Sequence, residues 1–122
     1  MPQEEILIRS ADLPTFTPAG GTLRMLAGEE HGLGLTLVVA EYPPGADLPA
    51  HRHSNGSAIV VVEGHGVFTV GDREVEAGPG DIVVIPANAW HSFRNDGDEW
   101  LRVVGADEGA SHDAELAPST DG

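Results

Sequence analysis

The residues best suited to chemistry in this sequence are three histidines in two separate segments. His51 and His53 form a His-x-His pair, and His91 lies much later in the chain. Alternate side chains of a β-strand point to the same face, so His51 and His53 would share a face that Arg52 does not. Neutral imidazole is a good ligand for iron, nickel, copper and zinc. Three converging imidazoles predict a metal site, and three histidines that fill a polar interior without a metal are the alternative.

The segments that must position these histidines are short, apolar and separated by turns. Turn residues such as Gly71-Asp72 interrupt the apolar runs, and no convincing helical pattern occurs. Strands are predicted over residues 22–26, 33–42, 57–63, 67–70, 73–77, 81–85, 91–95 and 100–105. Short strands at such regular spacing are typical of a β-sandwich or a β-barrel.

Two linked motifs around the histidines resemble those of the cupin superfamily. The matching positions of the first motif are Gly45, His51, His53 and Gly64. The matching positions of the second motif are Gly80, Pro86, His91 and Asn95, with Asn88 where glycine is usual. The flanking strands extend the resemblance to most of the chain. It implies an all-β jelly-roll barrel, also called a double-stranded β-helix.

The resemblance also implies a set of site residues. One divalent transition metal (Fe, Zn, Ni, Mn or Cu) is expected on His51, His53 and His91. Residues expected in the pocket or in support of the ligands are Ser57, Ile59, Val61, Phe93 and Tyr42. Phe93 shares the strand parity of His91, which makes it a candidate pocket wall. Tyr42 is either a possible acid or a packing residue at the end of its strand.

Ser57 stands where the first motif normally has a glutamate. Without that carboxylate, a three-histidine site keeps the full charge of its divalent ion and leaves coordination positions open for water or substrate. We therefore expect an anionic, chelating ligand and a stronger Lewis acid. Water or another acidic residue could take the vacant position, and Glu63 is the nearest candidate, although we expect it to be exposed. A degraded site that binds no metal is the alternative.

Composition excludes several classes of function. The net charge of −14 disfavours nucleic acid and anionic membrane surfaces as partners. All six basic residues are arginines, so a lysine Schiff base is impossible. The chain has no cysteine, which fits a cytoplasmic protein. No apolar run is long enough to span a bilayer and no leader opens the chain, so we expect a soluble, unprocessed protein.

Three regions are predicted. Residues 1–22 form an N-terminal arm, residues 23–106 form the cupin barrel, and residues 107–122 form an acidic tail. The tail carries a single leucine and is expected to be disordered, because it can bury little apolar surface. The apolar run of residues 6–8 is expected at the contact of a homodimer, because exposed strand edges favour pairing.

The resemblance favours a metal-dependent enzyme of small-molecule metabolism that acts on an anionic chelating substrate. Three-histidine cupins suggest a dioxygenase, whereas a redox-silent metal would suit an isomerase, cyclase or lyase that relies on Lewis-acid chemistry. The alternative is a non-catalytic cupin that binds a metal or a small ligand. One fold hosts many functions, so the resemblance alone does not choose between these classes.

Overall fold

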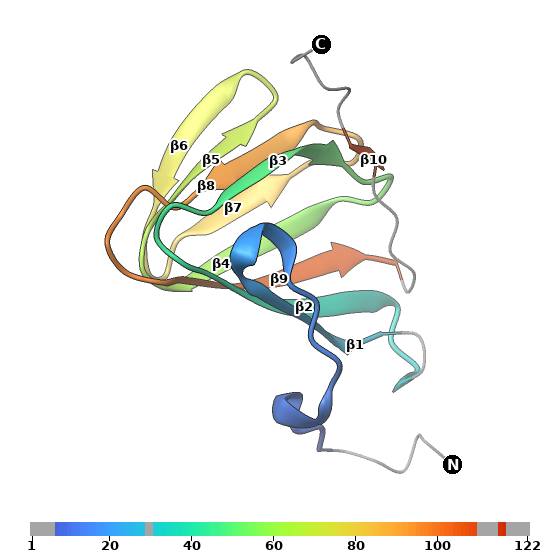
Figure 1. Cartoon of the computed structure of the whole chain (residues 1–122). Coiled ribbons are helices and arrows are strands. Elements are labelled where there is room, and N and C mark those ends of the chain that lie inside the picture. The colour runs from blue at the N-terminus through green and yellow to red at the C-terminus, as the bar shows by residue number, and fades with distance from the viewer. Residues whose placement is uncertain (1–6, 29–30, 110–114, 117–122) are drawn as a thin grey trace.

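The computed structural model describes residues 7–28, 31–109 and 115–116 (Figure 1). Its strands are β1 (Thr22–Ala27), β2 (Leu35–Tyr42), β3 (Asp47–Arg52), β4 (Ser57–Glu63), β5 (Gly66–Val70), β6 (Arg73–Ala77), β7 (Ile82–Ile85), β8 (His91–Arg94), β9 (Leu101–Glu108) and β10 (Glu115–Leu116). Two short 3-10 turns, η2 (Ser10–Asp12) and η3 (Pro18–Gly20), precede the first strand. None of the helical turns among the described residues is long and apolar enough to cross a membrane.

The strands form two five-stranded sheets with only antiparallel pairing among the described residues. Their orders are β1-β2-β9-β4-β7 and β10-β3-β8-β5-β6. Figure 1 shows β1, β2, β9 and β4 in one layer, facing β3, β8, β5 and β6 in the other. This arrangement confirms the predicted all-β jelly-roll barrel.

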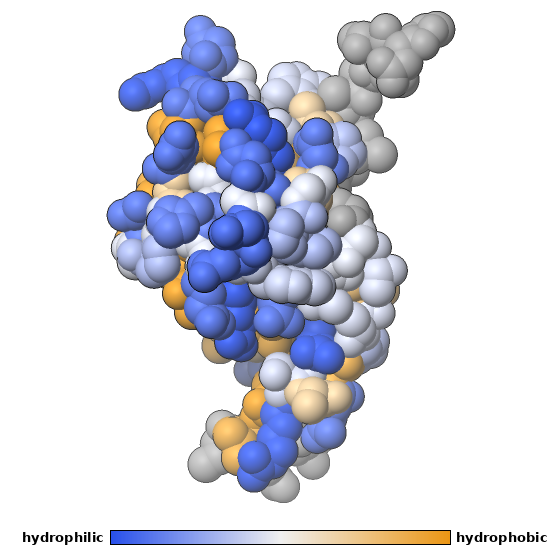
Figure 2. Space-filling view, turned by 60° about the vertical axis from the view of Figure 1, so that its left-hand side comes forward, coloured by the Kyte–Doolittle hydropathy of each residue, from blue (hydrophilic) through white to orange (hydrophobic). Residues whose placement is uncertain are grey.

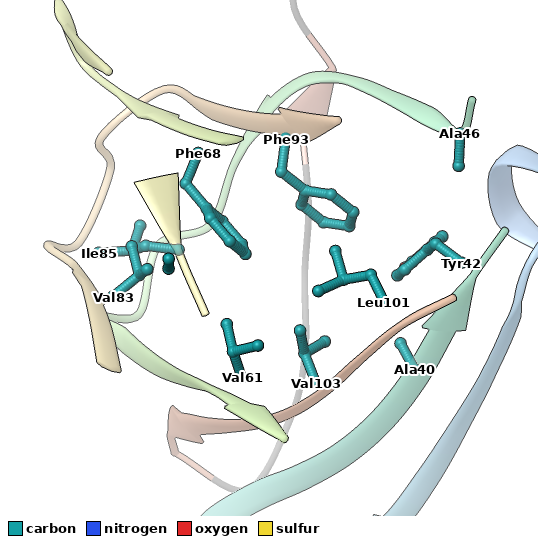
Figure 3. Close-up of a cluster of buried hydrophobic side chains, with 11 residues drawn as sticks. Ala40, Tyr42, Ala46, Val61, Phe68, Val83, Ile85, Phe93, Leu101 and Val103 are labelled. Carbon is teal, nitrogen blue, oxygen red and sulfur yellow. The ribbon is translucent and has the colours of Figure 1, made fainter. Parts of the chain in front are cut away.

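The apolar core fills one end of the space between the two sheets. Burial alternates along the strands, as in β7 and β8, because every second side chain faces inward. Figure 3 shows Phe68 and Phe93 of one sheet pointing toward Val61 and Val103 of the other. Phe68 is only 1% exposed, so its replacement by alanine should cost about 3–5 kcal/mol of stability.

Asn95 ties the end of β8 to neighbouring loops at the core end of the barrel. Its side-chain nitrogen donates to the carbonyl oxygens of Tyr42 at 3.1 Å and Glu99 at 2.8 Å. Its side-chain oxygen accepts from the backbone N–H of Gly97 at 3.1 Å. Asn95 is itself buried, and these bonds satisfy backbone groups of the turn that follows it and of the end of β2.

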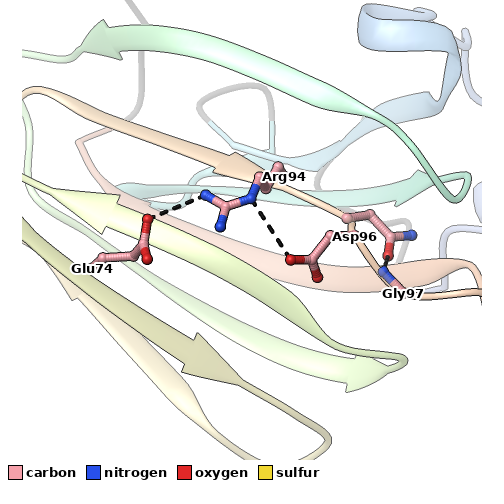
Figure 4. A network of polar contacts seen from close by, with 5 residues as sticks. Glu74, Arg94, Asp96 and Gly97 are labelled. Atoms are coloured by element: carbon pink, nitrogen blue, oxygen red, sulfur yellow. Dashed lines mark hydrogen bonds and ion pairs between the residues drawn. The ribbon is translucent and has the colours of Figure 1, made fainter.

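The outer surface carries ion pairs that contribute little to stability. Figure 4 shows Arg94 between Glu74, at 3.2 Å, and Asp96, at 3.7 Å. Pairs this exposed typically contribute about 0–1 kcal/mol. Figure 2 shows a mostly hydrophilic face on which apolar side chains lie in separate groups, in keeping with the large negative charge.

The structure places the end of the barrel later than the predicted boundary at residue 106. Strand β9 continues to Glu108, and Asp107 pairs with Thr36 of β2 and with Ser57 of β4. The lack of apolar side chains predicts a disordered tail, but residues 107 and 108 are held by backbone hydrogen bonds to neighbouring strands, which do not depend on apolar side chains. Residues 115–116 also pair with β3, opposite His51 and Arg52, and the other tail residues after 109 lie outside the described residues.

The N-terminal arm contacts the barrel through an isolated β-bridge between Phe16 and Leu23 and through a hydrogen bond from Arg24 Nε to Thr15 Oγ1 at 3.0 Å. Leu7 is exposed, while residue 6 of the predicted dimer contact lies outside the described residues. The homodimer therefore stays a prediction.

Candidate metal centre

Three histidines converge on the inner face of the sheet that contains β3 and β8. His51 and His91 are direct partners across β3 and β8, and His53 follows just after the end of β3. Their ring centroids lie 4.2 Å apart for His51 and His91, and 5.1 Å apart for each of the other two pairs. One nitrogen from each ring lies within 4.8 Å of the others. This spacing allows three nitrogens to surround one ion.

Backbone carbonyl groups set the tautomers of two of these rings. The Nδ1 atom of His51 lies 3.0 Å from the carbonyl oxygen of Pro49, and Nδ1 of His91 lies 3.0 Å from that of Ala89. A carbonyl oxygen only accepts hydrogen bonds, so a neutral ring in this position carries its proton on Nδ1. The lone pair then lies on Nε2, which is the arrangement that orients a histidine for metal binding.

His91 is the most buried member of the cluster, with 5% of its surface exposed. Burial lowers the pKa of His91 to about 4, and the hydrogen bond to Ala89 offsets this only in part. The nearby rings of His51 and His53 lower this pKa further. At neutral pH the His91 ring is therefore uncharged and can offer a lone pair.

The histidines open into a cavity of about 200 Å³ between the two sheets. Four of the five predicted pocket residues line it: Ser57, Ile59, Phe93 and Tyr42. Val61 does not line the cavity. It lies two positions beyond Ile59 on β4, where it is fully buried in the apolar core.

Gly105 leaves a gap in the cavity wall. It lies between Val103 and Asp107 on β9, and all three residues line the cavity because they share the inward parity. A Cβ atom built on Gly105 would have no atom within 4 Å, and the residue does not have a positive φ. The missing side chain at position 105 thus gives the cavity part of its volume.

Tyr42 forms the apolar base of the cavity together with Phe93. The two rings pack edge to face with centroids 4.8 Å apart. Burial raises the pKa of Tyr42 to about 12, so its hydroxyl keeps its proton at neutral pH. The hydroxyl is therefore a poor acid at neutral pH.

Asp107 is a cavity residue that the sequence reasoning missed. It is the only acidic residue among those that line the cavity. Inward-facing residues alternate along this strand at Leu101, Val103 and Gly105. Extending the predicted strand by two residues would have placed Asp107 on the same face. Glu63, the acidic candidate considered from the sequence, instead lies on the surface, 3.6 Å from Arg102.

A larger and more open hollow of about 820 Å³ lies between β6 and β7. None of the residues that line it is a histidine, and its walls include the exposed apolar side chains of Val75, Ile82 and Val84. The smaller cavity is the candidate site because it contains the histidine cluster.

Two known proteins are similar in sequence to most of this chain. A gentisate 1,2-dioxygenase from Ralstonia sp is 30% identical over 114 residues, which cover 81% of this chain and 31% of that protein. A 1-methylthio-D-xylulose 5-phosphate methylsulfurylase from Rhodospirillum rubrum is 31% identical over 84 residues, which cover 69% of this chain and 54% of that protein. The chain thus spans about a third of the first relative and about half of the second.

The solved structure of a cupin-2 domain from Rhodospirillum rubrum superposes with a TM-score of 0.79 at 26% identity. The match covers 94% of this chain and 82% of that one. The family model described as the cupin domain matches residues 38–106, which include both histidine segments. With this match and its two facing antiparallel sheets, the chain belongs to the cupin family.

Proposed function

We propose that this cupin is a metal-dependent enzyme that acts on a small, anionic, chelating substrate. His51, His53 and His91 hold one divalent transition metal ion. The observation that carries the proposal is the cluster of three imidazole nitrogens within 4.8 Å at the edge of a cavity. The tautomers set by Pro49 and Ala89 direct lone pairs away from the backbone, which supports the same assignment.

The bound ion supplies a Lewis acid, or a redox centre if it is iron, next to the cavity. The cavity of the protein orients the substrate and limits its size. Tyr42 and Phe93 form an apolar wall that excludes water, and the protonated Tyr42 hydroxyl can donate to a substrate oxygen. Binding sites for drug-sized ligands are usually about 300–1,000 Å³. The cavity of about 200 Å³ therefore favours a small substrate.

A dioxygenase is the reaction class we favour. A protein named gentisate 1,2-dioxygenase is among the relatives of this chain, although the chain spans only 31% of it. A non-redox metal would instead support isomerase, cyclase or lyase chemistry through polarisation of a substrate carbonyl. A non-catalytic cupin that binds a metal or a small ligand is the remaining alternative.

Two measurements test the proposal: the identity of the bound metal, and then the consumption of oxygen by the metal-loaded protein. Protein purified without chelators should contain close to one transition metal ion per chain by elemental analysis. Iron-loaded protein should then consume oxygen with at least one member of a panel of small hydroxy-, oxo- and aromatic carboxylic acids. A zinc-loaded sample should bind the same acid without consuming oxygen.

Substituted proteins provide the control. The variant His91→Ala should lose most of the metal, because two remaining nitrogens hold an ion much less tightly than three. The variant His65→Ala removes an exposed histidine that does not line the cavity, and it should keep the metal. Wild-type protein that stays metal-free with a folded barrel contradicts the proposal. Metal binding without turnover of any acid in the panel favours the non-catalytic alternative.

A further inference from the structure

We propose that Asp107 supplies the site with the carboxylate that is absent at Ser57, and that it thereby selects a hydroxycarboxylate over a dicarboxylate ligand. This inference rests on the proposed metal site of His51, His53 and His91. Asp107 acts from the neighbouring strand, as an outer acceptor for a group bound at the site.

The strand register brings Asp107 and Ser57 together. The two residues are direct partners in the antiparallel pairing of β9 with β4. Side chains that face each other across such a pair lie on the same side of the sheet, with Cβ atoms about 4.5–5.5 Å apart. A carboxylate on β9 therefore reaches much of the space that a carboxylate on β4 at position 57 would occupy.

The parity of β9 directs Asp107 inward. Val103, Gly105 and Asp107 alternate along the strand, and all three line the histidine cavity. The empty space beside Gly105 leaves the approach to Asp107 free of an intervening side chain on the same strand.

Other acidic residues near the site face elsewhere. Glu63 has 67% of its side chain exposed and pairs with Arg102. Glu108 is next to Asp107 but has the opposite parity, and it accepts a hydrogen bond from the backbone N–H of Gly56 at 3.0 Å. Neither residue lines the cavity.

Asp107 lines the same cavity as His51, His53 and His91. The carboxylate is not a member of the group of ligand atoms that lie within 4.8 Å of one another. Asp107 therefore suits the role of an outer group that accepts a hydrogen bond from whatever is held at the histidines.

This placement refines the class of substrate. A ligand that chelates through one carboxylate and a neighbouring hydroxyl can donate that hydroxyl hydrogen to Asp107. A ligand that chelates through two carboxylates brings a second negative charge toward Asp107 and has no hydrogen to donate. Glycolate and oxalate are two acids of equal length that test this difference. The ratio of glycolate affinity to oxalate affinity should be higher for the metal bound at this site than for the free metal ion.

The test compares the affinities of glycolate and oxalate for cobalt-loaded protein, measured through the visible absorption of Co²⁺. In the variant Asp107→Asn the glycolate affinity should fall about 10-fold or more, because a hydrogen bond to a charged acceptor is replaced by one to a neutral acceptor. The oxalate affinity should rise about fivefold or more, because repulsion is removed. The ratio of glycolate to oxalate affinity should thus fall by at least about 50-fold.

The matched control is Asp72→Asn, which removes the same charge from an exposed hairpin turn outside the cavity. Its ratio should equal that of the wild type. If Asp107→Asn disturbs the fold, Asp107→Ser provides the same comparison with a smaller side chain. A ratio within twofold of the wild type in a folded Asp107 variant overturns the inference. Wild-type protein that binds no Co²⁺ instead overturns the proposed metal site on which the inference rests.

Discussion

The substitution Gly105→Val should block the ligand cavity while leaving the metal centre intact. Valine adds three carbon atoms, each with about the volume of a water molecule (~30 Å³), or about 90 Å³ in total. The cavity measures about 200 Å³, and a Cβ atom at position 105 points into empty space. Nearly half of the room for a ligand is therefore lost, while His51, His53 and His91 are untouched.

The same substitution should not destabilise the protein. Glycine inside a strand costs about 0.5–1 kcal/mol, whereas valine is favoured there. Gly105 does not have a positive φ that valine would have to adopt. The thermal midpoint of Gly105→Val should therefore equal or exceed that of the wild type.

The assay measures two affinities in wild-type protein, Gly105→Ala and Gly105→Val. Calorimetric titration gives the affinity for Co²⁺, and the visible spectrum of the loaded protein gives the affinity for lactate. Cobalt affinity should stay within about threefold in all three proteins. Lactate affinity should fall slightly in Gly105→Ala and at least 10-fold in Gly105→Val. Unchanged lactate binding in a folded, cobalt-loaded Gly105→Val protein refutes the reasoning that this cavity holds the ligand.

Three further predictions concern pH, position 57 and assembly. In metal-free protein, His91 has a pKa near 4 when folded and 6.5 when unfolded. Between these two values the unfolded chain binds a proton that the folded protein does not. The free energy of unfolding, measured in urea, should therefore fall as pH drops from 6.5 to 4, and His91 should contribute at most about 3 kcal/mol to this fall. The variant His91→Gln should lack this contribution. Ser57→Glu should keep or raise Co²⁺ affinity and lower oxalate affinity at least about fivefold, because it adds a carboxylate at the site; equal oxalate affinity in both proteins would argue that position 57 does not set the chemistry. Deletion of residues 1–10 should convert a dimer into a monomer in light scattering, whereas an unchanged mass would remove the arm from the interface.

Local patterns in the sequence were enough to predict most of the strands, whereas the jelly-roll barrel was implied by the resemblance of the two histidine motifs to those of cupins. A continuous apolar run in β4 and an alternating pattern in β6, each next to a glycine turn, place these strands at the residues predicted. Asn88 stands where the second motif usually has glycine, and its φ of 66° is a left-handed conformation that asparagine tolerates better than most residues. These features depend on neighbours within a few residues, so the sequence displays them directly.

The missed parts of the site depend on contacts between distant segments. Asp107 belongs to a stretch of polar and small residues, and only its pairing with both Ser57 and Thr36 makes that stretch a strand. Val61 has the parity of a cavity residue, but its depth along β4 places it in the core. Parity gives the face on which a side chain lies, whereas position along the barrel depends on the register of all its strands.

The central claim is that His51, His53 and His91 together hold one metal ion. Crystals grown with a divalent transition metal should be measured at the absorption edge of that metal. The account predicts one anomalous difference peak per chain, about 2.0–2.2 Å from a ring nitrogen of each of the three histidines. Crystals of folded protein with no peak at the three histidines, or with a peak held by other residues, would contradict it.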